Sequence, residues 1–200
     1  KFFFKGVDWS SSETSLEKNQ NKKDFDNEPV LKRMKIQLQK SSIKTNYTEN
    51  LDLSWALKNI KPLINQHIEG NYILIFPFSS EKHKDKIWPY FAELIKEMKS
   101  IFGKKYNVVL APAPNEIEKA KNLNASIILN NGKALDLVEL ISFIKESSYI
   151  VSNDTGPAHI ASHLNKKGLA LFGSHTSPKK VSIGSKNMRT LEVKNLSDLK

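Results

Sequence analysis

The chain has 200 residues, of which 39% are hydrophobic and 26% charged, and it contains no cysteine. Such a chain is globular, with one full core or one domain plus part of another, and disulfide frameworks and thiolate metal sites are excluded. No apolar run approaches the roughly 20 residues of a membrane-spanning helix, and the run at residues 2–4 is too short for a signal peptide. We expect a soluble protein of a reducing compartment.

The formal net charge of +10 requires a partner or an explanation. Lysine is spread over most of the chain, with short clusters at residues 82–84 and 179–180. No basic motif is interleaved with aromatic residues that stack on bases, so the sequence predicts no nucleic-acid partner. Two interpretations remain open: a solvated lysine-rich surface, or attraction to anionic lipid or a phosphorylated sugar.

The first third of the chain has little regular pattern. Residues 2–4 are a candidate short strand, but the rest of residues 1–27 lacks a repeating apolar period and is predicted to be loop. A helix is expected just after Pro29, with Val30, Leu31, Met34 and Leu38 on one side. A second helix is predicted over residues 54–67, with these core candidates: Trp55, Ile60, Leu63 and Ile64.

From Tyr72 onwards, apolar strand patterns alternate with helical ones. Strands are predicted at 72–76, 107–110, 126–129, from 150 and at 169–172, and helices at 91–102, 116–123, 136–146 and from Pro157. This alternation predicts an α/β fold, a Rossmann-like parallel sheet with helices on both faces. Ligands of such sheets bind beyond the carboxyl ends of the strands, where the polar loops leave.

The turn that follows Ile150 and Val151 is the most informative stretch. It reads Asn-Asp-Thr-Gly and is followed by Pro157, which suits a first helical position. The helix should present several unpaired N–H groups and its positive dipole end to a ligand, and Gly156 should allow close approach to the backbone. The turn therefore indicates an anion site; an ordinary turn that binds nothing is the alternative.

The residues around this turn resemble a known motif. The run Asp154-Thr155-Gly156-Pro157-Ala158-His159 is followed by an apolar helix, a Lys-Lys-Gly turn, the strand at 169–173 and the segment 174–178. This order resembles the nucleotide-sugar motif of glycosyltransferase family 9, the ADP-heptose:lipopolysaccharide heptosyltransferases and their relatives, whose motif reads Asp-Thr-Gly-x-x-His and ends in Phe-Gly-x-Thr. The resemblance holds over most of residues 70–200, and it implies donor-binding roles for Asp154, Thr155, Gly156 and His159.

The resemblance also implies roles for the loop after the first strand. Family members place a small hydroxyl residue there, here Ser79 or Ser80, and a lysine two positions before a Trp-Pro pair, here Lys86. A lysine at this place provides a point charge for the nucleotide diphosphate, which leaves with increased negative charge. Lys82 and Lys84 can substitute, since the loop is longer than the usual pattern. A solvated basic loop is the alternative interpretation.

Two further loops match family segments. Glu116 takes the place of a family glutamate, and such a carboxylate can accept both ribose hydroxyls, as in dinucleotide folds. The alternative is a helix-start glutamate stabilised by the helix dipole. The loop that contains Lys133 and Ala134 lies where family members hold the adenine through backbone groups.

His159 and His163 stand one helical turn apart, so a zinc site has to be considered. A metalloprotease motif requires glutamate after the first histidine, and Ile160 stands there instead. No third ligand accompanies the pair, so no metal is predicted. His159 matches the motif histidine, whereas His163 is assigned to packing or surface.

The resemblance implies the C-terminal, donor-binding half of a two-domain GT-B glycosyltransferase. Residues 1–66 would be the tail of the N-terminal, acceptor-side domain with the linker, and residues 67–200 the nucleotide-sugar-binding domain. We expect an inverting, metal-independent and cofactor-free transfer of heptose from an ADP-sugar to a lipid-linked lipopolysaccharide core. A bacterial cytoplasmic protein at the inner face of the inner membrane is implied, with peripheral contact to anionic lipid.

The catalytic base is expected outside this sequence. The family's candidate is an aspartate of the N-terminal domain, and the Gly-Asp segment that would carry it does not occur here. A second hypothesis is therefore a non-catalytic nucleotide or nucleotide-sugar binding protein of the same fold. An upstream reading frame that supplies the missing half would favour the transferase over this alternative.

Overall fold

The structure is a computed structural model that describes residues 10–11, 13, 15–46, 48, 51–103 and 105–200. The chain divides into two compact units, Lys1–Leu51 with Lys179–Ser182, and Asp52–Pro178 with Ile183–Lys200. The candidate strand at residues 2–4 lies outside the described residues. The assignment of residues 1–66 to a separate N-terminal domain stays a prediction.

The first unit contains two short helices, α1 (Lys22–Asn27) and α2 (Val30–Lys40). The Asn21 side chain caps α1 by accepting the Lys23 N–H at 2.8 Å, and Phe25 is buried. The prediction of loop through residue 27 is therefore wrong at α1, because a local cap and one anchored aromatic ring stabilise it without a repeating apolar pattern. α2 begins after Pro29, as predicted, but Met34 on its apolar side is 51% exposed.

The second unit begins with a 3-10 turn and a short helix, η1 (Ser54–Ala56) and α3 (Lys61–His67). The prediction of one helix over this stretch is wrong, because Pro62 fits only the first turn of a helix and here lies in the first turn of α3. Ile60 and Ile64 are buried and Leu63 is half-buried, but Trp55, expected in the core, is 79% exposed.

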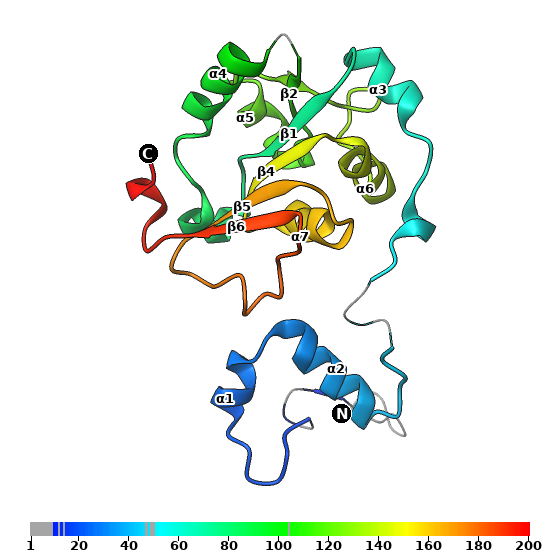
Figure 1. Ribbon diagram of the computed structural model, residues 1–200, viewed down its shortest axis with the longest axis vertical. Helices are drawn as coiled ribbons and strands as arrows, with labels where there is room; N and C mark the ends of the chain where they lie inside the picture. Colours follow the sequence, from blue (N-terminus) through cyan, green and yellow to red (C-terminus); the bar gives the residue numbers. More distant parts are fainter. Residues whose placement is uncertain (1–9, 12, 14, 47, 49–50, 104) are drawn as a thin grey trace. The chain divides into compact units, whose positions relative to one another are not determined.

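A six-stranded parallel sheet forms the centre of this unit (Figure 1). Its strands are β1 (Tyr72–Phe76), β2 (Asn107–Leu110), β3 (Ser126–Ile127), β4 (Tyr149–Asn153), β5 (Gly168–Phe172) and β6 (Met188–Glu192), in the order β3-β2-β1-β4-β5-β6. The first five confirm the predicted strands, although β3 is shorter. The sequence did not predict β6, because it is a polar edge strand in which only Met188 is buried.

Helices cover both faces of the sheet, which confirms the predicted fold class. They are α4 (Phe91–Phe102), α5 (Ile117–Ala120), α6 (Leu137–Glu146) and α7 (Gly156–His163). α4 and α5 pack on the face that carries Ile73 and Ile75. α6 packs on the other face, where the ring of Phe143 stacks on that of Tyr72 with 4.7 Å between the ring centroids. α5 ends earlier than predicted, before Asn122, a residue type that competes with helical backbone bonds.

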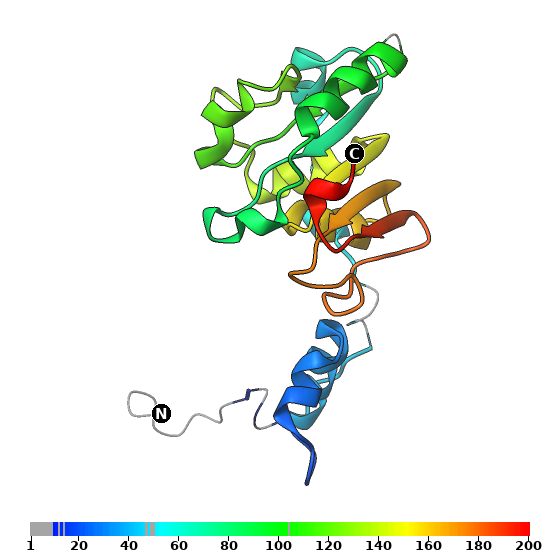
Figure 2. The same cartoon turned by 90° about the vertical axis from the view of Figure 1, so that its left-hand side faces the viewer.

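The loops at the carboxyl ends of the strands carry three short 3-10 helices, η2 (Glu81–Lys86), η3 (Pro114–Glu116) and η4 (Leu196–Asp198). Figure 2 is turned so that this edge of the sheet faces the viewer. Trp88, which follows η2, is buried and donates its indole N–H to the Leu199 carbonyl at 2.8 Å. The edge is therefore held together by side chains from the loops themselves.

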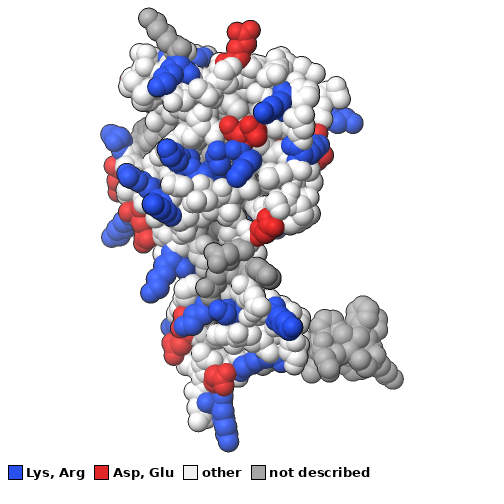
Figure 3. Space-filling model, turned by 45° about the vertical axis from the view of Figure 1, so that its right-hand side comes forward, with Lys and Arg blue, Asp and Glu red and all other residues white. Residues whose placement is uncertain are grey.

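The surface of the chain is rich in lysine. Figure 3 shows basic side chains spread over much of the visible face, with acidic side chains between them. Among the described residues, no helix combines the length and the apolar character that crossing a bilayer requires.

Candidate functional site

The strand order reverses between β1 and β4, which are neighbours in the sheet. The chain continues from β1 towards β2 and from β4 towards β5, so the two connections leave in opposite directions. The two strands end side by side, with Phe76 opposite Ser152. Ligands of open parallel sheets bind in the crevice outside the carboxyl ends at such a reversal. The loop after β1 and the turn after β4 therefore define the candidate site.

Asn153, the last residue of β4, fastens the loop after β1 to the sheet. Its side chain is fully buried, accepts the Trp88 N–H at 3.0 Å and donates to the Pro77 carbonyl at 2.9 Å. Both ends of the loop are thus held by one amide, and η2 between them is kept beside the turn after β4. The sequence did not single out Asn153, because its role depends on two partners more than 60 residues away.

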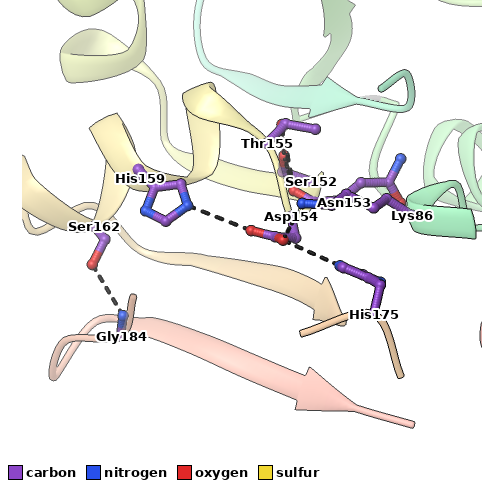
Figure 4. Close-up of polar contacts among 9 residues, drawn as sticks. All are labelled: Lys86, Ser152, Asn153, Asp154, Thr155, His159, Ser162, His175 and Gly184. Atoms are coloured by element: carbon purple, nitrogen blue, oxygen red, sulfur yellow. Dashed lines mark hydrogen bonds and ion pairs between the residues drawn. The ribbon is translucent and has the colours of Figure 1, made fainter. Parts of the chain in front are cut away.

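Asp154 lies at the centre of the site, directly after this anchor (Figure 4). Its side chain is only 2% exposed. Oδ2 lies 2.8 Å from Nζ of Lys86 and 3.1 Å from Nε2 of His175, and Oδ1 lies 3.4 Å from Nε2 of His159. The three partners come from η2, from the loop after β5 and from α7.

The environment of Asp154 determines its ionisation. Burial favours the neutral carboxyl and acts to raise the pKa, but hydrogen bonds from His159, Lys86 and His175 and the charge of Lys86 outweigh it, so the pKa of Asp154 lies well below its ordinary range. The side chain is therefore an anion at neutral pH. An ionised carboxylate only accepts hydrogen bonds, so each of the three partners donates to it.

The structure separates Lys86 from the other two lysines of its loop. Lys82 and Lys84 are exposed, whereas the Lys86 side chain is 23% exposed and reaches the buried carboxylate. Of the three candidates, Lys86 is the one held in the crevice. Its role towards a diphosphate stays a prediction.

The start of α7 differs from what the sequence led us to expect. Pro157 is the second helical residue and has no N–H, while Ala158 and His159 both donate to the Thr155 carbonyl, at 3.0 and 3.4 Å. Within residues 156–159, which are all described, this leaves the Gly156 amide for an anion. The expectation of several unpaired N–H groups is therefore wrong, because a proline in the first turn and a tight first hydrogen bond remove them.

Gly156 is exposed, and a Cβ added to it would meet no atom within 4 Å. The glycines with positive φ among the described residues are Gly70, Gly132 and Gly184. A positive φ at Gly156 is therefore excluded, and a side chain there would project into open space at the start of α7.

A cavity of about 350 Å³ adjoins the turn, over the ends of β1 and β2. It is within the size range of pockets for small ligands. Its wall is mainly apolar, with Leu110, Leu135 and Leu140 among the lining residues. Four of the predicted site residues also line it: Ser79, Ser80, Glu116 and Thr155.

Two polar residues of this cavity, Ser80 and Glu116, already have local hydrogen bonds. The Ser80 hydroxyl accepts the Lys82 N–H at 3.3 Å and caps η2. The Glu116 Oε2 accepts the Ala113 N–H at 2.9 Å, which is the helix-start arrangement weighed as the alternative. Because a carboxylate has further acceptor capacity, this contact leaves Glu116 able to bind a hydroxyl of a ligand as well.

The loop that contains Lys133 and Ala134, assigned to adenine, lies mostly outside the cavity. The Lys133 N–H and carbonyl bond to Asn130 in a tight turn, at 3.0 and 2.8 Å. Lys133 and Ala134 do not belong to the described residues that line the cavity, whereas Leu135 does. Any backbone contact to a base therefore falls to the end of this loop.

The two histidines of α7 have different surroundings. His159 points to Asp154 (Figure 4), whereas His163 is half-buried, and its pKa is lowered by burial and by the nearby His159. In the part of the chain that the structure describes, no group of three or more histidine, cysteine or acidic side chains is arranged to hold a metal ion.

His175, like Asn153, is a site residue that the sequence reasoning missed. It follows β5 by three positions, and its side chain is 8% exposed beside Asp154. The signal was present, since polar residues after the carboxyl ends of neighbouring parallel strands gather at one edge. The order of the strands was needed to use it.

Three solved structures from E. coli are similar to this chain. ADP-heptose lps heptosyltransferase II has 22% sequence identity, with 79% of this chain and 49% of that one covered and a TM-score of 0.58. Heptosyltransferase WaaC with ADP has 18% identity, coverages of 92% and 55% and a TM-score of 0.59. The same enzyme with ADP-2-deoxy-2-fluoro heptose has 18% identity, with 92% of this chain and 54% of that one covered and a TM-score of 0.58. No curated protein sequence matches the chain.

These likenesses show the fold, and the chain spans about half the length of the similar structures. A family model provides the assignment. The model of glycosyltransferase family 9 (heptosyltransferase) matches residues 2–198, nearly the whole sequence. The chain therefore belongs to glycosyltransferase family 9.

Proposed function

We propose that the chain binds the nucleotide part of an ADP-heptose-type donor at the reversal between β1 and β4. The observation that carries this proposal is the adjacency of two features. A mainly apolar cavity of about 350 Å³ is lined by Thr155 and Pro157, and Asp154, which forms an ion pair with Lys86, directly precedes Thr155. A flat base and a diphosphate require such a pair of neighbouring sites.

The proposed chemistry is that of charge stabilisation. A diphosphate gains negative charge as its bond to the sugar breaks, and preformed positive groups stabilise that charge. Lys86 supplies such a positive charge and His159 adds a ring N–H donor; their side chains are partly exposed, at 23% and 33%, and both contact Asp154. The dipole of α7 and the Gly156 amide add to them. We propose that these groups act on the diphosphate and that no metal is required.

The remaining donor contacts follow the lining of the cavity. We propose that Ser79 and Ser80 bind phosphate or ribose oxygens and that Glu116 accepts the ribose hydroxyls. The base would then lie against the apolar wall, next to the end of the loop that contains Lys133 and Ala134. The similar E. coli structures with ADP and with ADP-2-deoxy-2-fluoro heptose support a donor of this class.

We propose the transfer itself at the level of the whole enzyme. Residues 67–200 would be the donor domain and residues 1–66 would belong to the acceptor side, with the base on the N-terminal domain. The reaction would be an inverting, metal-independent transfer of heptose to a lipid-linked lipopolysaccharide core. The net charge of +10 would favour contact with an anionic membrane at the cytoplasmic face.

Calorimetry with the 200-residue chain tests the donor assignment. ADP and ADP-heptose should bind, and UDP and GDP should bind at least about tenfold more weakly, since a pocket shaped for one base rejects the others by roughly that factor. Equal affinity for all four ligands would remove the adenine assignment. In a longer chain that also carries the acceptor-side domain, binding without turnover in the presence of the acceptor would favour the non-catalytic alternative.

The lysine of the diphosphate site is tested by substitution. Lys86→Ala should weaken ADP binding by about 1–3 kcal/mol, the scale of a charged hydrogen bond. Lys82→Ala and Lys84→Ala are matched controls from the same loop, since both side chains are exposed. Equal losses in all three variants would mean that the loop acts as a diffuse basic surface.

A further inference from the structure

The three partners of Asp154 differ in how much they face solvent. Lys86 and His159 are 23% and 33% exposed, so a ligand in the crevice can reach both of them. His175 is 8% exposed and approaches the same carboxylate from the loop after β5. Figure 4 shows Lys86, His159 and His175 arranged around Asp154. Two of the partners are thus open to exchange and one is enclosed.

This division matters because Asp154 and a bound diphosphate need the same hydrogen-bond donors. Lys86 donates to Asp154 Oδ2 at 2.8 Å, and it has to weaken that contact in order to bind phosphate oxygens. A carboxylate that is 2% exposed cannot replace the lost donor with bulk water. A buried anion that loses its partners is strongly destabilised, so it would retain Lys86 and oppose ligand binding.

His175 is held where it can keep the carboxylate satisfied. Its ring stacks on Phe172, with 6.5 Å between the ring centroids and 13° between the planes. A Cβ placed on Gly173 would lie 3.3 Å from Nδ1, so the absence of a side chain there makes room for the ring. Because the carboxylate only accepts, Nε2 carries the hydrogen and donates to Oδ2 at 3.1 Å.

The other ring nitrogen has no competing contact among the described residues. Nδ1 of His175 is buried without a hydrogen-bond partner and lies beside Gly173. Among the described residues, Asp154 is therefore the one polar partner of this ring. The ring is stacked on Phe172 and its other nitrogen is buried without a partner, so turning away from the carboxylate would cost the ring its polar contact.

We propose that His175 is a positioning residue for donor binding: it keeps Asp154 hydrogen-bonded and oriented while Lys86 and His159 turn to the diphosphate. The inference rests on the proposed function, because it requires a diphosphate at Lys86. His175 acts through Asp154 and does not touch the donor. It affects the affinity for the donor because it allows Lys86 to leave Asp154 and bind the diphosphate.

Two amide substitutions separate this role from simple packing. In His175→Gln the side-chain amide nitrogen takes the place of Nε2 and can still donate to Asp154. In His175→Asn the amide is shorter and takes the place of Nδ1, away from Asp154. Both are neutral amides, so they differ mainly in reach. His67→Leu, an exposed histidine of α3, is the control for losing a histidine elsewhere.

The expected result with ADP and the 200-residue chain is specific. His175→Gln and His67→Leu should bind ADP within about twofold of wild type, and His175→Asn about tenfold more weakly, the scale of one hydrogen bond. Lys86→Ala should cost about 10- to 100-fold in wild type but only about threefold in the His175→Asn background, because contacts in one network are not additive. A packing role predicts the same Lys86→Ala factor in both backgrounds.

The outcomes are distinct. Wild-type binding of ADP together with an unchanged His175→Asn variant, or an equal Lys86→Ala factor in both backgrounds, overturns this inference alone. A wild-type chain that binds neither ADP nor ADP-heptose overturns the proposed function and the inference with it. If His175→Asn does not fold, the ¹⁵N signal of Nε2 in the wild-type chain decides: it should keep its proton when ADP is added, and a loss would refute the role.

Discussion

Removal of the Lys86 side chain should destabilise the fold through Asp154. The pair joins Nζ and Oδ2 at 2.8 Å, and the Asp154 side chain is 2% exposed. Breaking a buried ion pair from one side costs about 3–5 kcal/mol. Lys86 is 23% exposed, and two histidines stay near the carboxylate. We therefore expect Lys86→Ala to lower the free energy of unfolding by about 2 kcal/mol, below that range.

Urea unfolding at several pH values measures this effect and its origin. The folded-state pKa of Asp154 is lowered, so the stability it contributes is fully present above the ordinary aspartate pKa of about 3.9 and is lost as pH falls through the folded-state value. The cost of Lys86→Ala should therefore be constant from neutral pH down to about pH 4 and shrink below it. Lys82→Ala and Lys84→Ala should change stability by less than about 0.5 kcal/mol at every pH.

A double-mutant cycle that combines Lys86→Ala with Asp154→Asn tests whether Lys86 stabilises the fold through its ion pair with Asp154. Asparagine has no charge for Lys86 to pair with, so Lys86→Ala should cost less than about 0.5 kcal/mol in that background. If the cost stays near 2 kcal/mol, or if it does not change with pH, Lys86 stabilises the fold through its aliphatic chain and the ion-pair account is wrong.

Three further changes test other parts of the site. Gly156→Val should abolish ADP binding in calorimetry. The urea midpoint should stay near wild type, because the added side chain meets open space in the folded chain. Unfolding at lower urea would instead assign the glycine to the turn. His159→Ala should weaken ADP binding severalfold, with EDTA without effect on either protein; a loss on chelation would revive a zinc site with His163. Asn153→Ala removes two buried hydrogen bonds and should cost about 2–3 kcal/mol and speed proteolysis of residues 77–89, whereas a stable, resistant variant would mean that the Trp88 ring alone holds the loop.

Much of the fold could be predicted because its signals are local. The apolar runs at 72–76 and 107–110 and the helix at 91–102 each carry their pattern within a few residues, and all three appear as predicted. The misses also have local causes. β6 has one buried residue and so no apolar pattern, and the predicted helix over residues 54–67 divides because Pro62 begins a new one.

The site was predictable only in part, for a different reason. The turn that contains Asp154 and the loop that contains Lys86 were identified from their residues and from the family resemblance. Nothing in either stretch showed that Lys86 and Asp154 bond to each other, or that Asn153 holds the loop. The number of free amides at α7 was also misjudged, because it depends on where the first hydrogen bond forms.

The sequence by itself determined the alternation of strands and helices, the polar loops at the carboxyl ends and the excess of positive charge. These features depend on residue type and on spacing within about ten positions. Only the tertiary structure decided that Lys86, 68 residues before Asp154, and His175, 21 residues after it, meet at one buried carboxylate. The physical reason is that β4 lies between β1 and β5, and that order is fixed by the packing of the whole sheet.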